Sequence, residues 1–380
     1  MRCRLSIVFA LVLVFASALT PAYPTDAAAP PTAGNEQTSA ADSPFLILYP
    51  QLRQAPAPAW LRPGVRLTYN SAYATFAREI DDPTPSGAGL IQYDVIAQDR
   101  RSVVVVPTLY GIDSQGQPPT GLGYLLGLPG LGETWFAPQV LADAEAAAHD
   151  GLLVNRLTVD VEGESYDVVR FQSNTDSGEE VWEFEEQTGL LVFHRQALYD
   201  GAGNQTSANM QSLVGRRQVK LPWRFGSVPT WASRGAEIEL AGSQTIDLGS
   251  PPYIPLPMAI RLRITKAGSL WSEYSRATYM NSRQIAQGSG ATGVAQIFGG
   301  IWLPPQALGV LHAGEVLDRD PLTGLETSVA EATARQIVIA GQGPSYTTRY
   351  VYDARSGRLI GYSQEAHMLA GVQYTDLSAP

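Results

Sequence analysis

The sequence predicts a mainly β protein that consists of two tandem copies of one curved antiparallel sheet, half-barrel-like, with one or a few short helices in each copy. Three observations lead to this fold class. A 13-residue hairpin pattern occurs twice, tryptophan landmarks recur in the same order, and the composition is turn-rich, with 36 Gly, 27 Pro and only 16% charged residues in 380. Such a composition is more typical of a β protein than of a helical one.

The repeated pattern spans residues 182–194 (WEFEEQTGLLVFH) and residues 350–362 (YVYDARSGRLIGY). Each copy has aromatic residues at its first and third positions, an acid at the fourth, a hydroxyl at the seventh and a glycine at the eighth. The acid and the hydroxyl favour a turn, and the glycine permits positive φ between two apolar runs. Each copy therefore predicts a β-hairpin.

Four landmarks repeat with nearly constant offsets, which indicates an internal duplication. Trp60 and Trp231 lie in Pro-x-Trp-x-x-x-Gly segments, and Trp135 and Trp302 each precede a Pro-Gln pair. The offsets are 231 − 60 = 171 and 302 − 135 = 167, the hairpin glycines differ by 357 − 189 = 168, and two Thr-Gly pairs differ by 292 − 120 = 172. We expect a first β-rich domain over residues 58–226 and a second over residues 227–377.

Alternating or dense apolar runs predict the strands of the first copy. These runs cover residues 65–70, 90–97, 102–110, 152–161, 166–172, 181–185 and 190–197. Pro138 is suited to the first position of a helix that continues into the alanine-rich residues 142–149. In the second copy, Asp318-Arg-Asp-Pro-Leu-Thr-Gly324 predicts a hairpin turn where the first copy has this helix.

The N-terminus has the pattern of a secretory signal peptide. Arg2 and Arg4 precede an apolar run over residues 5–19, which ends in the small residues Ala16-Ser-Ala18. We expect residues 1–22 to be a signal peptide and the protein to be exported, periplasmic or extracellular; the alternative is a retained N-terminal membrane anchor. Residues 23–57, rich in Pro and Ala, are predicted to form an extended linker or to be disordered, except around the apolar residues 45–52.

Several function classes are disfavoured. A net charge of −10 disfavours nucleic acid. The four histidines, His149, His194, His312 and His367, lack metal-site spacing, and Asp318-x-Asp320 is better explained by a turn than by a calcium loop. No nucleophile motif is present, although a convergent site leaves no fixed signature. The expectation is no enzyme, no metal and no cofactor.

A group of glutamates crowds the first hairpin. It comprises Glu179, Glu180, Glu183, Glu185 and Glu186. These acids fit either paired functional carboxylates or an exposed edge that discourages strand pairing.

Two glycine-rich apolar runs, each followed by a tryptophan, are the candidate ligand-binding segments. Glycines permit close backbone approach to a ligand, but a buried crossover loop explains the runs equally well, and tryptophan is by default a core or strap residue. The candidate ligand-binding residues are Leu125, Leu126, Leu128, Leu131, Trp135, Ile297, Phe298, Ile301 and Trp302.

The signal peptide and the pattern Tyr350-Val-Tyr-Asp353-x-x-Ser356-Gly357-x-Leu359 resemble envelope half-barrel families. These are the periplasmic lipoprotein carrier, the mycobacterial lipid-transfer lipoproteins and the sigma-factor regulatory sensor domain. The resemblance implies a half-barrel whose concave face holds acyl chains. No lipobox follows Cys3, which departs from the lipoprotein members, and no catalytic residues are carried over.

The function that the sequence favours is an exported, non-enzymatic envelope protein that binds an apolar small molecule or lipid in its half-barrels. A structural or protein-interaction module of the envelope is the alternative, and a hydrolase with a convergent site is the third hypothesis. Contact with a membrane is expected only through an uncleaved N-terminal segment.

Overall fold

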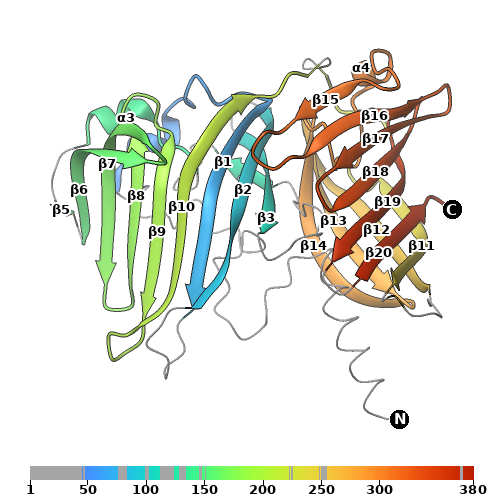
Figure 1. The fold of residues 1–380 in the computed structure, drawn as a ribbon. Coiled ribbons are helices and arrows are strands. Elements are labelled where there is room, and N and C mark those ends of the chain that lie inside the picture. The colour runs from blue at the N-terminus through green and yellow to red at the C-terminus, as the bar shows by residue number, and fades with distance from the viewer. Residues whose placement is uncertain are drawn as a thin grey trace, which may run out of the picture.

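A computed structural model describes residues 45, 48–75, 84–98, 102–111, 124–127, 134–144, 148–149, 151–221, 223, 226–247, 249, 255–368 and 371–380. Within these residues the chain forms two ten-stranded antiparallel sheets, side by side and joined by one crossing of the chain (Figure 1). The prediction of a mainly β protein with two tandem curved sheets is confirmed. We call the sheet of β1 to β10 the first unit and the sheet of β11 to β20 the second unit.

The first unit has the strand order β4-β3-β2-β1-β10-β9-β8-β7-β6-β5. Its strands are β1 (Val65–Thr75), β2 (Thr84–Gln98), β3 (Ser102–Gly111), β4 (Tyr124–Gly127), β5 (Ala148–His149), β6 (Leu152–Val161), β7 (Glu164–Thr175), β8 (Gly178–Glu185), β9 (Leu191–Tyr199) and β10 (Gln205–Gln218). Two short helices accompany them, the 3-10 helix η3 (Pro50–Gln54) and α3 (Pro138–Ala142).

The second unit repeats this topology in the order β14-β13-β12-β11-β20-β19-β18-β17-β16-β15. Its strands are β11 (Glu237–Asp247), β12 (Leu256–Ala267), β13 (Trp271–Met280), β14 (Arg283–Gly293), β15 (Val316–Arg319), β16 (Glu326–Ala332), β17 (Gln336–Gln342), β18 (Tyr346–Asp353), β19 (Leu359–Met368) and β20 (Gly371–Ser378). Its helix is α4 (Pro305–Leu308).

The predicted helix after Trp135 begins at Pro138 as expected, but it is shorter than the alanine-rich run suggested. Ala148 and His149 belong to β5, because they pair with Leu153 and Leu152 of the neighbouring strand. The second copy also has a helix, α4, at the equivalent place, since 305 − 138 = 167. The hairpin of Asp318 to Gly324 is the counterpart of β5, not of the helix, since β15 and β5 begin 316 − 148 = 168 residues apart.

Each hairpin glycine packs against a short segment that we call the strap. The strap contains Trp135 and Phe136 in the first unit and Trp302 and Leu303 in the second. Gly189 and Gly357 both have φ +68°, and a Cβ would lie 1.9 Å from the Phe136 carbonyl oxygen and 2.3 Å from that of Leu303, respectively. The Phe136 N–H donates to the Gly189 oxygen at 2.7 Å, and the Leu303 N–H to the Gly357 oxygen at 2.8 Å. Only glycine fits this close approach in the left-handed conformation.

The other tryptophan pair, Trp60 and Trp231, lies just before the first strand of each sheet and bonds to the same hairpin turns. The Trp60 indole N–H donates to the Thr188 carbonyl at 2.8 Å, and the Trp231 indole N–H donates to the Ser356 carbonyl at 2.8 Å. The repeated sequence signature is therefore a structural joint between the hairpin, the strap and the start of each sheet.

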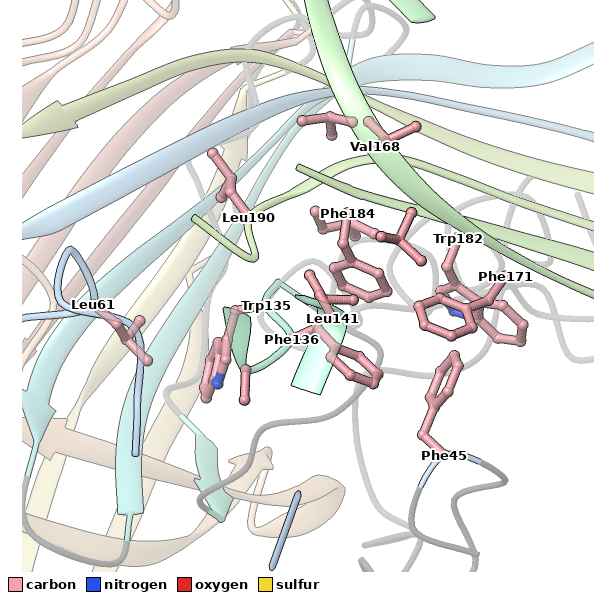
Figure 2. Packing of buried hydrophobic residues seen from close by; sticks show 14 of the residues in the cluster. Phe45, Leu61, Trp135, Phe136, Leu141, Val168, Phe171, Trp182, Phe184 and Leu190 are labelled. Atoms are coloured by element: carbon pink, nitrogen blue, oxygen red, sulfur yellow. The ribbon is translucent and has the colours of Figure 1, made fainter. Parts of the chain in front are cut away.

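The core of the first unit is completed by the N-terminal segment. Phe45, Tyr49 and Leu52 lie within the predicted linker, yet all three are buried in the main core cluster. The Phe45 ring packs edge-on against Phe171 at 5.1 Å and against Trp182 at 5.0 Å between ring centroids (Figure 2). Burial of these large apolar rings explains why the segment is ordered against the sheet.

Residues of the predicted signal peptide, 1–22, lie outside the described residues, so this remains a prediction. Across the described ranges, none of the helices has the length and apolar character needed to cross a membrane.

Candidate binding site

The structure places the predicted site tryptophans in the two cores. Trp135 and Trp302 are each 1% exposed, and the Trp302 indole N–H donates to Ser272 Oγ at 2.7 Å. The interpretation of these two residues as core residues is confirmed. Ile297 and Ile301 are also buried in the second core.

The remaining predicted site residues fall into two groups. Leu125 and Leu126 lie on β4, whereas Leu128 and Leu131 lie outside the described residues. Phe298 is partly buried against the second core. Its ring occupies the space beside Gly341, where a Cβ would lie 2.4 Å from the ring, and it packs edge-on against Tyr350 at 4.9 Å.

A row of buried polar side chains crosses the inner face of the second unit, the face that carries its core. Gln244 of β11 pairs with Thr375 of β20, Thr375 with Gln364 of β19, and Gln364 with Thr348 of β18. Because side chains alternate between faces, all four share the face of the core residues Leu240, Leu377, Tyr362 and Tyr352. We call these four residues the polar row; their exposed fractions run from 1% to 6%.

Several polar atoms of this inner face have no hydrogen-bond partner. Of eight buried side-chain atoms without a partner in the described part of the chain, six belong to the second unit. Four of the six are on the inner face of its sheet, namely Gln244 Oε1, Arg276 Nε, Thr278 Oγ1 and Thr348 Oγ1. Burial without a partner costs about 1 to 3 kcal/mol per group, so such a concentration points to a polar occupant of this interior.

Arg276 is the charged member of this inner face. It lies on β13 two residues after the core residue Tyr274, and its strand neighbours are Leu262 and Gly288. Among the described residues no carboxylate forms an ion pair with Arg276, in contrast to Arg66, Arg156, Arg170, Arg195, Arg217, Arg261, Arg263 and Arg319.

The charge of Arg276 acts on three buried tyrosines of the second unit. Burial raises the pKa of Tyr274, Tyr350 and Tyr362, and in each case the positive charge of Arg276 opposes that rise. The three hydroxyls therefore stay protonated at neutral pH. The Tyr362 hydroxyl donates to Gln364 Oε1, which connects this group to the polar row.

A second polar cluster joins the two units. The hairpin of β15 and β16 extends toward the first unit (Figure 1), where Asp318 and Asp320 meet Arg66 and Arg217. Asp320 Oδ2 accepts hydrogen bonds from Arg66, Arg217 and Gln92, each at 2.8 Å. Burial alone would raise the pKa of Asp320, but these hydrogen bonds outweigh burial and lower it well below its ordinary value.

This network, which we call the interunit clasp, fixes the relative position of the two sheets. Arg66 is also held by Asp94 of its own unit, with contacts of 2.5 and 2.8 Å. An apolar contact lies beside the clasp, where Trp271 and Ala291 of the second unit pack against Ile96 and Val104 of the first. The units are thus bonded through both charges and apolar surface.

A small cavity of about 60 Å³ lies between the units beside the clasp. Arg66 and Tyr110 line it from the first unit, and Phe298, Thr327 and Tyr350 from the second. This volume is enough for a few water molecules but not for a lipid.

A larger groove of about 690 Å³ crosses strands β11 to β14. Exposed ion pairs form much of its walls, Arg261 with Glu239 at 3.3 Å and Arg263 with Glu237 at 3.6 Å. Leu262 and Arg276, whose side chains alternate to the inner face, also border it. Ions that are already paired and hydrated offer little to a ligand, so we favour the inner face as the candidate site.

The crowded glutamates of the first hairpin are explained by local pairing. Glu183 is 3% exposed and pairs with Arg170, while Glu180 Oε1 accepts a hydrogen bond from His194 Nε2 at 2.9 Å. Within the described ranges no cluster of three metal-ligating side chains occurs. The structure gives these acids structural partners.

No protein-family model matches the sequence, and no curated protein matches it. A structural comparison gives a protein of unknown function from the DUF3598 family of Nostoc punctiforme PCC 73102, with 10% identity over 84% of this chain and 97% of that chain and a TM-score of 0.16. Intact Ap-TbpB, with its N and C lobes, gives 8% identity over 86% of this chain and 79% of that chain and a TM-score of 0.10. These similarities extend no further than a loose all-β resemblance.

Proposed function

We propose that the protein is an exported, non-enzymatic binding protein whose second half-barrel holds an amphipathic ligand. The observation that carries this proposal is the set of unpartnered, buried polar atoms on the inner face of the second unit. A ligand with polar atoms at one end would satisfy them, and its apolar part would contact the neighbouring core residues Ile260 and Leu262.

The two units differ in a way that favours the second as the ligand-binding unit. The interior of the first is filled by its own aromatic residues, because Phe45 inserts among Phe136, Phe171, Trp182 and Phe184. Among the described residues, the first unit contributes two of the eight unpartnered atoms, in Tyr49 and Gln92.

The resemblance to envelope lipid-carrier families supports an acyl chain as the apolar part, and the predicted signal peptide supports export. Ligand binding without chemistry agrees with a sequence that contains no nucleophile motif. The binding region differs from the tryptophans themselves, since Trp135 and Trp302 are enclosed by protein atoms.

Native mass spectrometry of the protein from its own host, combined with displacement of a fluorescent fatty acid, tests this proposal. Thr348→Leu replaces a hydroxyl of the polar row with a bulkier apolar side chain and should weaken probe binding at least tenfold. Thr347→Leu, on the other face of the same strand, is the matched control and should bind normally. A clean ligand-free mass together with no measurable probe binding would refute the proposal.

The second candidate function is a rigid interaction module of the cell envelope. The interunit clasp favours it, because four charged side chains and an apolar contact hold the sheets in one arrangement. Cross-linking on intact cells should then recover one partner repeatedly, and Asp320→Ala should abolish that cross-link by releasing the units. If cross-linking of the Asp320→Ala variant recovered the same partner, partner binding would not depend on the fixed arrangement of the two units.

A further inference from the structure

We propose that the ligand of the second half-barrel is an anionic amphiphile, an alkyl carboxylate, whose carboxylate pairs with Arg276. This inference rests on the proposed function and names the chemical class of its ligand. It depends on three features of the inner face: the unpaired guanidinium, the hydroxyl groups around it and the apolar surface next to it.

The guanidinium is the first feature. Arg276 shares the inner face with Tyr274 and Thr278 by strand alternation, and its Nε is buried without a partner. Arg276 as a whole is partly buried, and a charge partly removed from water is stabilised by an opposite charge. Acidic partners hold the buried arginine of the interunit clasp, Arg66, whereas within the described residues Arg276 has none. An anionic ligand would supply the missing charge.

The hydroxyl groups are the second feature. The charge of Arg276 acts on Tyr274, which is two residues away on the same strand face, and on Tyr350, and burial raises the pKa of both, so their hydroxyls stay protonated at neutral pH. The Tyr362 hydroxyl already donates to Gln364. The unpartnered hydroxyl of Thr278 lies two residues along the strand from Arg276. A guanidinium offers two parallel N–H donors that match the two oxygens of a carboxylate, and neighbouring hydroxyls add further donors.

The apolar surface is the third feature. Leu262 is the direct strand neighbour of Arg276, and Ile260 is the neighbour of Thr278. Both belong to the second core, as does Met258 on the same strand. A carboxylate at Arg276 therefore lies next to aliphatic side chains, and this juxtaposition selects a ligand with an alkyl chain instead of a small hydrophilic anion.

The experiment compares dodecanoate, dodecanol and acetate by isothermal titration calorimetry with the full mature chain. The variants are Arg276→Gln, Arg276→Lys and, as a control, Arg261→Gln, which removes an exposed arginine that points away from the core on the neighbouring strand. We expect dodecanoate to bind the unmodified protein, Arg276→Gln to raise its Kd by roughly 10- to 100-fold, and Arg276→Lys to recover part of the loss. Dodecanol should bind weakly and equally to all variants. Thermal melting shows that each variant is folded.

The outcomes separate this inference from the proposed function. Equal binding of dodecanoate and dodecanol, unchanged by Arg276→Gln, would overturn the anionic ligand while the proposed function stands. Acetate binding as tightly as dodecanoate would overturn the alkyl chain. Absence of binding by both twelve-carbon probes, together with a ligand-free native mass, would remove the proposed function itself.

Discussion

Replacement of Gly357 by alanine should destabilise the second unit far more than an ordinary glycine replacement. The residue has φ +68°, and an added Cβ would lie 2.3 Å from the Leu303 carbonyl oxygen. The left-handed conformation alone costs a non-glycine residue about 1 to 2 kcal/mol. The close contact must also push the strap away from the hairpin.

The strap and hairpin are joined there by two hydrogen bonds, Leu303 N to Gly357 O at 2.8 Å and Leu359 N to Ile301 O at 3.1 Å. Loss of both adds about 2 kcal/mol, since a typical hydrogen bond contributes about 1 kcal/mol. We therefore expect Gly357→Ala to lower the free energy of unfolding by about 3 to 4 kcal/mol.

Gly314→Ala is the matched control, because Gly314 also lies in the second unit with φ +85° but has no atom within 4 Å of its added Cβ. It should lose only the backbone cost of about 1 to 2 kcal/mol. Urea unfolding followed by tryptophan fluorescence and by native-state hydrogen exchange of β18 measures both variants. Equal destabilisation by the two substitutions would refute the claim that the hairpin glycine is required for strap packing.

Three further predictions concern the clasp and the first core. Because the folded-state pKa of Asp320 is lowered, its contribution to stability is complete above the ordinary value of 3.8 and declines progressively as pH falls from there toward the lowered folded-state pKa. Urea unfolding at about pH 5 and at about pH 2.5 should therefore show a smaller loss of stability on acidification for Asp320→Ala than for the unmodified protein, and equal losses would contradict this. Asp320→Ala should cost about 3 to 5 kcal/mol by leaving Arg66 buried with one fewer partner, whereas Arg319→Ala, at an exposed pair, should change stability by under about 1 kcal/mol in the same urea assay. Phe45→Ala should destabilise the first unit by about 3 to 5 kcal/mol and expose its aromatic cluster to a hydrophobic dye, and a loss under about 1 kcal/mol would mean that the N-terminal segment does not complete the core.

The duplicated fold could be predicted because the contacts between hairpin, strap and first strand require glycine and tryptophan at fixed positions. A glycine forced to positive φ against a carbonyl, and a tryptophan that donates to the same turn, leave a recognisable spacing even when the two copies have diverged. The same logic failed for the helix after Trp135, because alanine composition reports local propensity and β5 is set by pairing with β6.

The side-chain clusters of the interunit clasp and of the candidate site were harder to predict. Asp318 and Asp320 were recognised as parts of a turn, but their pairing with Arg66 and Arg217 depends on how the two sheets pack against each other. Arg276 did leave a signal, since it lies on the same face of strand β13 as Tyr274 and Thr278. Recognising it as an inward charge requires knowing which face of that strand is buried.

In each unit, the first strand pairs with the last. Val65 of β1 lies opposite Gln218 of β10, a separation of 218 − 65 = 153 residues, and Ala241 of β11 lies opposite Ser378 of β20, a separation of 378 − 241 = 137. Until the ribosome has made the last strand of a copy, the middle of its sheet presents an unpaired edge of eleven residues. Contacts between such distant parts of a chain form slowly. A nascent copy therefore passes through an aggregation-prone stage that ends only when its final strand arrives, and shielding this edge is a natural task for a chaperone.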